Sequence, residues 1–344
     1  MIGAESQQLE GTRYNNQPGE PTLPYSVVTV GAAAVDLVAQ VDTFPGADQL
    51  VLAREVRREP GGSTANIAVR LAQLGERVAF AGLVGDDASG QYLKQAFASE
   101  GVATELITTV TNGNTASAVV MVNPEGQRAI LSLGGTALYS EIAQVPAGVW
   151  ESKLLYIGEA YLPLVRQLVN GACSRDQQVF YGPGGIFVRE GWAALAEASR
   201  GIKGLFLNWE ECMLLLGQEA RVPSQLPALA EWLALVIKEA GWWQGALEEI
   251  VVTLGARGCI WLAPDDLSWQ PAMPGRVVDT TGAGDAFTAG YLAAYLKGWP
   301  VQTRLKFATA CASLAIEGQG PRSGQLTLER VTTRLQLEGG MAGG

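Results

Sequence analysis

The strongest chemical signal in the chain is a glycine-rich stretch, Asp279-Thr280-Thr281-Gly282-Ala283-Gly284-Asp285-Ala286-Phe287. The apolar run 286–296 that overlaps its end predicts a buried helix of about three turns. Glycine lets backbone N–H groups approach a ligand closely, and a helix N-terminus carries partial positive charge. The stretch therefore predicts a phosphate-type anion site at the start of the helix, with the carboxylate of Asp285 at its mouth.

A purely structural interpretation of the same stretch is also open. Asp285 can serve as an N-cap, and the glycines can form a tight turn, because such turns often precede helices. The stretch alone does not separate the two interpretations, so the remaining sequence has to.

The composition narrows the chemistry. The chain has 344 residues, which is enough for one large α/β domain or two ordinary ones. It contains no histidine, which excludes Ser-His-Asp and Cys-His catalysis and His-ligated zinc. Proton transfer is left to carboxylates, Lys, Tyr or Cys. The net charge of −10 argues against nucleic acid or an anionic membrane as a partner.

The cysteines and the chain ends suggest where the protein works. No CxxC pair occurs, so the thiols are expected to be reduced and the protein cytoplasmic; they are Cys173, Cys212, Cys259 and Cys311. We find no run of transmembrane length and no signal-peptide pattern. Residues 1–24 are polar and predict a disordered leader, and 337–344 predict a flexible tail.

Two further features lie in the first quarter of the chain. Asp36 follows the predicted strand 27–30, where α/β proteins commonly bind ligands, although a surface loop acid is the alternative. The segment Gly61-Gly62-Ser63-Thr64-Ala65-Asn66 opens a predicted helix. A simple helix cap would explain Ser63 or Thr64, but not the paired glycines or a polar Asn66 on an otherwise apolar segment.

The order of elements predicts an α/β fold. From about residue 150, predicted strands and helices alternate, and repeated βα units imply a mostly parallel sheet with helices on both faces. Residues 50–59 and a hairpin around the turn 123–126 predict a small separate sheet. The predicted strands of the main part are 78–84, 154–157, 178–181, 204–207 and 250–253, and the helices are 88–99, 164–173, 189–199, 208–216, 228–240 and 301–316.

The two glycine-rich segments, in this order and more than 200 residues apart, resemble the ribokinase-like (pfkB) carbohydrate kinase family, which includes fructokinases and adenosine kinase. Further matches cover most of 25–325. The resemblance implies a ribokinase-like three-layer sandwich, with a mostly parallel central sheet and a small β-sheet lid. The kinase domain would span 25–336, and the lid would be about 40–58 and 115–134.

The resemblance implies roles on the acceptor side. Asp285 is similar to the general base that takes the proton from the substrate hydroxyl. The backbone N–H groups of Gly282, Ala283 and Gly284 are similar to an anion hole for the transferring phosphoryl group. We expect Gly284 to adopt a conformation that a β-carbon would disfavour. The substrate-binding positions are Asp36, Gly61, Gly62 and Asn66.

Roles on the nucleotide side follow from the same resemblance. Asn208 and Glu211 match a pattern that acts on Mg²⁺ and phosphate through water, with a helix cap as the alternative for Asn208. Asp279 stands where the family holds a monovalent cation, expected to be K⁺. The remaining nucleotide-binding positions are Thr253, Gly255, Gly258 and Thr309, the last in place of an Asn beside the adenine.

The sequence therefore predicts a kinase that transfers the γ-phosphoryl of ATP to a hydroxyl of a small unphosphorylated sugar, with Mg²⁺ and K⁺ as cofactors and a homodimer through the lid. A nucleoside (adenosine-like) kinase is the alternative. The pocket segments 31–36 and 61–66 hold no Lys or Arg, which disfavours a phosphosugar. Ribokinases proper carry Lys where this chain has Ser63-Thr64, which leaves the sugar open.

Two rival classes are less well supported. A catalytically silent sugar-binding regulator would be expected to lose the base first, whereas Asp285 is present. An NAD-dependent dehydrogenase needs a GxGxxG after the first strand, and Gly31-Ala32-Ala33-Ala34 does not provide it.

Overall fold

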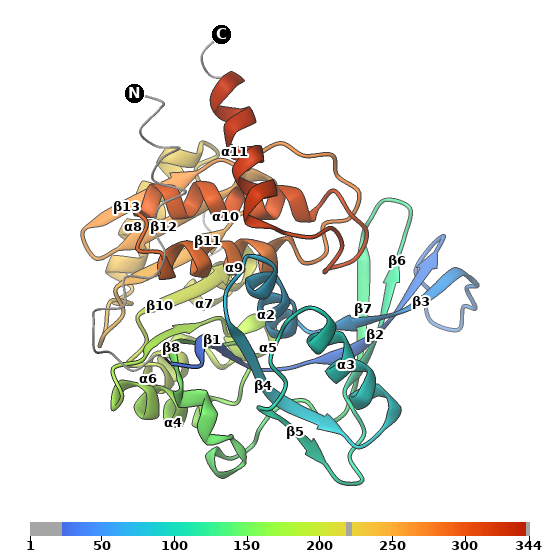
Figure 1. Cartoon of the computed structure of the whole chain (residues 1–344). Coiled ribbons are helices and arrows are strands. Elements are labelled where there is room, and N and C mark those ends of the chain that lie inside the picture. The colour runs from blue at the N-terminus through green and yellow to red at the C-terminus, as the bar shows by residue number, and fades with distance from the viewer. Residues whose placement is uncertain (1–22, 218–221, 342–344) are drawn as a thin grey trace.

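The computed structural model describes residues 23–217 and 222–341, which form a layered body and a projecting β-sheet arm (Figure 1). The predicted leader therefore lies almost wholly outside the described residues. Among these residues, no helix is both long enough and apolar enough to cross a membrane.

The body is built on a nine-stranded sheet in the order β13-β12-β11-β10-β9-β8-β1-β4-β5. Strand β4 is buried along its whole length, as expected for a strand covered on both faces. The last two strands pair antiparallel and form an edge that the sequence analysis does not predict. The strands are β1 (Tyr25–Val30), β4 (Val78–Gly85), β5 (Ile107–Val110), β8 (Ser152–Ile157), β9 (Gln178–Tyr181), β10 (Gly204–Asn208), β11 (Glu249–Thr253), β12 (Cys259–Ala263) and β13 (Asp266–Gln270).

Helices cover both faces of this sheet and complete the predicted three-layer sandwich. Neighbouring strand residues such as Val27 and Val28 belong to separate buried apolar clusters, because successive side chains point to opposite faces. One cluster lies under α2 (Ser63–Gln73), α3 (Ala88–Ser99), α9 (Ala283–Leu296) and α10 (Val301–Ala315). The other lies under α4 (Leu162–Cys173), α6 (Trp192–Ala198), α7 (Trp209–Leu216) and α8 (Leu226–Glu239).

Two helical predictions need correction. The predicted helix 189–199 is interrupted at Gly191, which has a φ of 83°. Helix α5 (Gly184–Phe187) and a further helical turn end before this glycine, and α6 begins after it. Helix α11 (Leu328–Met341) packs against α10 and runs through the first part of the predicted tail. Its glycine pair disfavours helix, but the buried side chain of Val331 secures the helix to the body.

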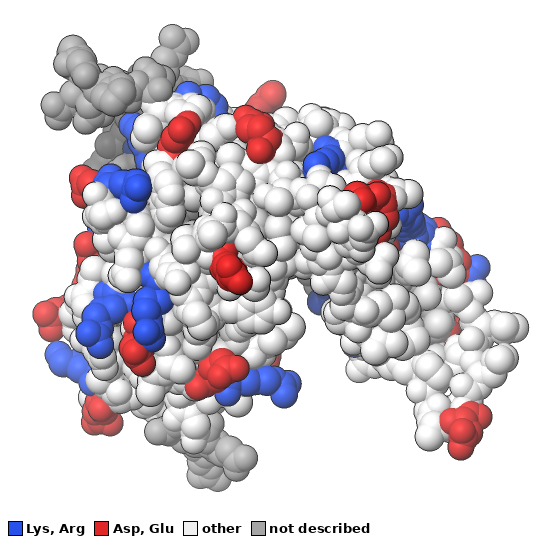
Figure 2. All heavy atoms as spheres, turned by 90° about the horizontal axis from the view of Figure 1, so that it is seen from below, with Lys and Arg blue, Asp and Glu red and all other residues white. Residues whose placement is uncertain are grey.

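The arm is a four-stranded sheet in the order β3-β2-β6-β7. Its strands are β2 (Ala34–Val41), β3 (Ala53–Gly61), β6 (Ser117–Val122) and β7 (Arg128–Gly134). The predicted hairpin is present as β6 and β7, which pair antiparallel. The arm begins at residue 34, earlier than the predicted lid, so it carries Asp36 on β2. In the space-filling view, the surface is hollowed between the body and the arm (Figure 2).

Candidate active site

Asp285 lies in the first turn of α9, but it is not the N-cap. The N-cap is Gly282, which has a φ of 76° in the left-handed region. A β-carbon at Gly282 would come within 2.7 Å of the carbonyl oxygen of Pro321. Both the conformation and the space therefore require glycine at this position, and the carboxylate of Asp285 is left available for contacts with other elements.

The Asp285 carboxylate joins the two glycine-rich segments. Ser63 Oγ donates to Oδ1 at 2.6 Å, and Asn66 Nδ2 donates to Oδ2 at 2.8 Å. Burial raises the pKa of Asp285, and these two hydrogen bonds act in the opposite direction. The contacts connect the start of α2 to the start of α9, and they orient a desolvated carboxylate, which suits a general base.

Free backbone donors surround the start of α9. The N–H groups of Gly282, Gly284 and Asp285 make no hydrogen bond among the described residues, whereas the Ala283 N–H donates to the Thr280 carbonyl at 3.3 Å. These donors lie at a helix N-terminus, where an anion is stabilised. The free set thus differs from the predicted one in two ways: it lacks the N–H of Ala283, and it includes the N–H of Asp285.

The expected conformation of Gly284 is wrong. Its φ is not in the left-handed region, and a β-carbon built on it meets nothing within 4 Å. Gly284 is exposed, so the space in front of its N–H is open. The backbone conformation requires glycine at Gly282. At Gly284 the absence of a side chain leaves the N–H groups at the start of α9 uncovered.

Asp36 lies on the arm directly beside the glycine-rich segment 61–66. A β-carbon at Gly61 would collide with the Asp36 carboxylate, which therefore depends on glycine at that position. Its oxygens accept no hydrogen bond from the described residues. Burial raises the pKa of Asp36 to about 6, against the lowering effect of Arg322. Gly62, with a φ of 95°, is the N-cap of α2.

Arg322 is a site residue that the sequence analysis misses. Its Nε donates to Asn66 Oδ1 at 2.9 Å, so the Asn66 amide bridges Arg322 and Asp285. The sequence contains one hint of it: Arg70 stands in an otherwise apolar helical segment. In the structure Arg70 is fully buried and donates to backbone carbonyls of the loop that carries Arg322. A buried arginine needs partners of this kind.

Glu159 is a second missed residue. It follows β8 as Asp36 follows β1, and Thr64 Oγ1 donates to its Oε2 at 3.0 Å. Burial raises the pKa of Glu159, and the negative charge of Asp285 adds to that effect. The position just past a strand of the parallel sheet is the signal that identifies it.

On the nucleotide side, Asn208 and Glu211 form a capping box at α7. Asn208 Oδ1 accepts from the Glu211 N–H at 2.8 Å, and Glu211 Oε2 accepts from the Asn208 N–H at 3.0 Å. The capping interpretation is thus observed, and it leaves Glu211 Oε1 without a hydrogen bond among the described residues. Because that oxygen is free, an additional role in holding water around Mg²⁺ stays a prediction.

Of the other predicted nucleotide positions, Thr253 lies beside Asn208, and Gly255 and Gly258 follow it in the chain. Thr253 pairs in register with Asn208 across β10 and β11. Gly255 and Gly258 follow it with φ values of 58° and 107°. Thr309 is buried in α10, and its hydroxyl donates to the carbonyls of Leu305 and Lys306 in its own helix. Its predicted place beside an adenine therefore stays a prediction.

Asp279 holds the loop in front of the anion site. Its Oδ1 accepts from Thr281 N at 2.8 Å and from Thr281 Oγ1 at 2.6 Å, and its Oδ2 accepts from the Gly320 N–H at 2.9 Å. Despite burial, these hydrogen bonds lower the pKa of Asp279, so the group stays ionised. An ionised oxygen with a remaining lone pair fits a monovalent cation.

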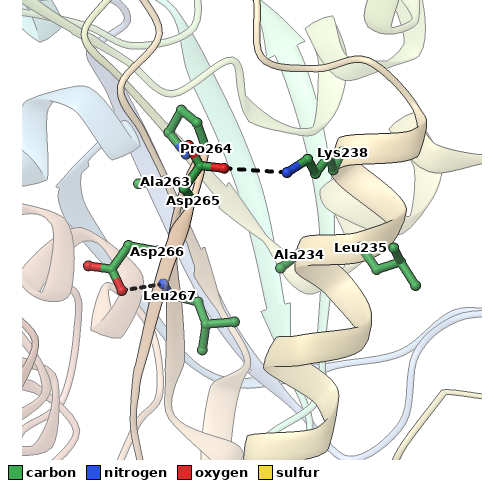
Figure 3. A pocket seen from close by; sticks show the side chains of 8 residues that line it. All are labelled: Ala234, Leu235, Lys238, Ala263, Pro264, Asp265, Asp266 and Leu267. Atoms are coloured by element: carbon green, nitrogen blue, oxygen red, sulfur yellow. Dashed lines mark hydrogen bonds and ion pairs between the residues drawn. The ribbon is translucent and has the colours of Figure 1, made fainter.

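A separate hollow of about 300 Å³ lies between α8 and the β12–β13 turn, and none of the predicted site residues lines it (Figure 3). An exposed ion pair between Lys238 and Asp265, 3.4 Å apart, crosses it. It is therefore distinct from the cluster around Asp285.

Known proteins that are similar to this chain include kinases of sugars and nucleosides. A nucleoside kinase from Methanothermobacter thermautotrophicus is 28% identical over 298 residues, covering 86% of this chain and 91% of the relative. An ATP-dependent ribose-1-phosphate kinase from Halopiger xanaduensis is 29% identical over 302 residues, covering 86% of this chain and 94% of the relative. The structure of Arabidopsis thaliana ribokinase complexed with ribose and ATP matches with a TM-score of 0.78 and 25% identity, covering 91% of this chain and 99% of that one.

The family model described as pfkB family carbohydrate kinase matches residues 25–328, which include both glycine-rich segments and the arm. The fold and the family predicted from the sequence are thereby confirmed. The chain belongs to the pfkB family of carbohydrate kinases and is a phosphotransferase with an alcohol group as acceptor.

Proposed function

We propose that the chain transfers the γ-phosphoryl group of ATP to a hydroxyl of a small unphosphorylated sugar, in the manner of a ribokinase or fructokinase. The observation that carries this proposal is the Asp285 carboxylate, bonded to Ser63 and Asn66 and adjacent to the free N–H groups at the start of α9. A base and an anion site side by side are what phosphoryl transfer to an alcohol requires.

The proposed reaction uses these groups in sequence. The substrate hydroxyl donates its proton to Asp285 as its oxygen attacks the γ-phosphorus, and ADP leaves with the electrons of the broken P–O bond. The N–H groups of Gly282 and Gly284 donate to the oxygens on which negative charge develops. Asn66 and Ser63 keep the carboxylate in place, so little reorganisation is needed during the step.

Mg²⁺ and K⁺ are part of the proposal. When bound, they would offset the negative charge of the phosphates. Glu211 would act on Mg²⁺ through water with its free Oε1, and Asp279 would hold K⁺ with an oxygen that is already fixed by Gly320. Both are carboxylate oxygens, which suit hard cations.

The acceptor is proposed to be unphosphorylated because the site is acidic. Asp36, Glu159 and Asp285 gather around the acceptor side, and a doubly charged phosphosugar would add to their mutual repulsion. A nucleoside is the second candidate, favoured by the nucleoside kinase from Methanothermobacter thermautotrophicus. A nucleoside would contain the same hydroxyl-bearing ring.

The proposal is tested by ATP turnover against a panel of free sugars, phosphosugars and nucleosides, with Mg²⁺ and K⁺ present. We expect ADP release that depends on at least one free sugar. If a nucleoside gives the highest kcat/KM, the alternative replaces the sugar. If no acceptor stimulates ADP release, the proposed function is wrong.

We propose further that two copies associate through the arm. Leu37 and Leu131 are exposed by 37% and 57% and lie on one face of its sheet, since Leu37 aligns with Leu131 through β6. The face that carries Leu37 and Leu131 is opposite to that of Asp36. Leu133, exposed by 55%, lies close by in β7, at the irregularity in its pairing with β6. Light scattering should give a dimer for the wild type and a monomer for Leu131→Glu, with Leu235→Glu on α8 as the matched control. A monomeric wild type would contradict this assignment.

The cytoplasmic location also stays a proposal. Within the described residues all four cysteines are free thiols, and three of them are buried. Free thiols are typical of a reducing compartment.

A further inference from the structure

Arg322 has two buried nitrogens that its own protein does not use. Nε is bonded to Asn66 Oδ1 at 2.9 Å, but Nη1 and Nη2 are buried and find no hydrogen-bond partner in the part of the chain that the structure describes. The guanidinium carbon lies over the Phe97 ring, 5.4 Å from its centre. Buried donors of a charged group are rarely left unpaired in a protein, so these two point to a missing partner.

The position of Arg322 is built by surrounding residues. Arg70 donates to the carbonyls on both sides of it, to Pro321 at 3.0 Å and to Ser323 at 2.9 Å. Asp279 accepts from the Gly320 N–H at the start of the same loop. The loop is therefore held at two points, and its arginine is presented next to Asn66 in a set orientation.

The charges around Arg322 indicate what kind of partner fits. Burial raises the pKa of both Asp36 and Asp285, and the positive charge of Arg322 acts in the opposite direction on each. The two acids already offset the arginine, and an added anion would face both of them. A neutral hydroxyl fits, because it accepts a hydrogen bond from a guanidinium and donates one to a carboxylate.

We propose that Arg322 is a specificity-determining residue of the acceptor site, whose Nη1 and Nη2 donate to hydroxyl oxygens of the sugar while Asp36 accepts the protons of those hydroxyls. The inference rests on the proposed function and deepens it, since it names the group that selects a polyol. Asp36, whose oxygens accept no hydrogen bond from the described residues, and Arg322 then satisfy each other through the substrate.

The test compares wild type with Arg322→Met and Arg322→Lys. Methionine keeps an apolar contact with Phe97 and removes the donors, whereas lysine keeps the charge and loses the planar fork. Arg330→Met is the matched control, because Arg330 is exposed on the same C-terminal segment and, among the described residues, its side chain bonds only the Gln325 carbonyl, at 2.6 Å. Thermal unfolding confirms that each variant is folded.

The acceptors are the best sugar of the panel, analogues that each lack one hydroxyl, and its phosphate ester. Binding is measured by calorimetry as well as by turnover, so that the sugar site is tested even if no acceptor is phosphorylated. We expect Arg322→Met to weaken sugar binding by about 10- to 100-fold with little change in kcat, and Arg322→Lys to fall between. Removal of one particular hydroxyl should weaken binding in wild type and have little effect in Arg322→Met.

Three results would overturn the inference. Sugar affinity in Arg322→Met equal to that of the Arg330→Met control would show that the nitrogens do not contact the sugar. An unchanged penalty for every missing hydroxyl would assign Arg322 a purely structural role. A wild-type preference for the phosphate ester that disappears in Arg322→Met would make it an anion site. In contrast, absence of turnover with normal, Arg322-dependent sugar binding would contradict the proposed function alone.

Discussion

The acceptor side and the nucleotide side of the site differ in how their polar groups are bonded. On the acceptor side, hydrogen bonds join distant segments: Asn66 bridges Asp285 and Arg322 across α2, α9 and the loop before α11. At three of the predicted nucleotide-side positions the bonds are local, since Asn208 pairs with Glu211 in one helical turn and Thr309 bonds its own helix. Asp279 is the exception, because it accepts from the Gly320 N–H. The acceptor side is therefore held together by contacts between distant segments, whereas, among the described residues, the side chains of Asn208, Glu211 and Thr309 bond only within their own helical segments.

This difference predicts where single substitutions act. Changes on the acceptor side should break a network and affect chemistry or sugar binding strongly. Changes on the nucleotide side should be milder, because each residue can be lost without disturbing a distant one.

The largest effect is expected from Asp285→Asn. Asparagine keeps the size of the side chain but cannot accept the proton, so kcat should fall by about 10²- to 10⁴-fold while sugar affinity changes little. Steady-state kinetics on the purified variant measure both. Turnover close to wild type would assign Asp285 a structural role, and Asp266→Asn on the exposed β13 edge is the control.

Gly284→Val should come next. The β-carbon enters open space, so we expect an unchanged melting temperature, but the side chain would cover the N–H groups and lower kcat by about 10²- to 10³-fold. Gly282→Val is the contrasting variant, since its φ of 76° and the Pro321 carbonyl should make it unstable. Thermal unfolding and kinetics together separate the two. A folded and fully active Gly284→Val would remove the anion hole from the account.

Asp36 should set the affinity for the sugar. Asp36→Ala should raise KM by an amount worth about 2–4 kcal/mol, because a desolvated carboxylate loses its hydrogen bonds to hydroxyls. Its pKa is raised to about 6, so the ionised form is present above that pH and lost below it. In wild type, KM should therefore rise as the pH falls through about 6. Asp36→Asn should show no such rise, and an identical pH profile in both would refute the assignment.

The smallest effect is expected from the cation. Replacement of Na⁺ by K⁺ at constant Mg²⁺ and ionic strength should raise the rate several-fold, and Asp279→Asn should reduce that response. Because Asp279 also accepts a hydrogen bond from Gly320, the melting temperature of the Asp279→Asn variant must be recorded to show that it stays folded. Equal rates in K⁺, Na⁺ and a bulky organic cation would exclude a monovalent ion from the mechanism.

The sequence predicts the local features well. Helix 88–99, strand 178–181 and the lid hairpin follow from periodicity and turn chemistry, and each of them is visible within a short window of residues. The two glycine-rich segments point to the Asp285 carboxylate and its contacts with Ser63 and Asn66, because glycine and small residues mark close approaches of the backbone.

Contacts between residues that are far apart in the sequence cannot be predicted from such short windows. Arg322 reaches the site from a loop that is more than 250 positions beyond Asn66, and the one local hint of it is the buried Arg70, which donates to the backbone carbonyls of that loop. Gly282 and Gly284 look alike in sequence, but the carbonyl of Pro321 lies near only one of them. Tertiary neighbours decide both cases, and no local pattern contains them.

The most direct test of the account compares three acceptors that share one ring: ribose, ribose 1-phosphate and adenosine. They carry a hydroxyl, a phosphate and a base at the same carbon, and they represent the three acceptor classes that the names of the similar proteins give: a nucleoside, ribose 1-phosphate and ribose. If the acceptor site is preassembled for a neutral polyol, ribose should give the highest kcat/KM of the three, with ADP and phosphorylated sugar formed in equal amounts. A higher kcat/KM for ribose 1-phosphate would contradict the account.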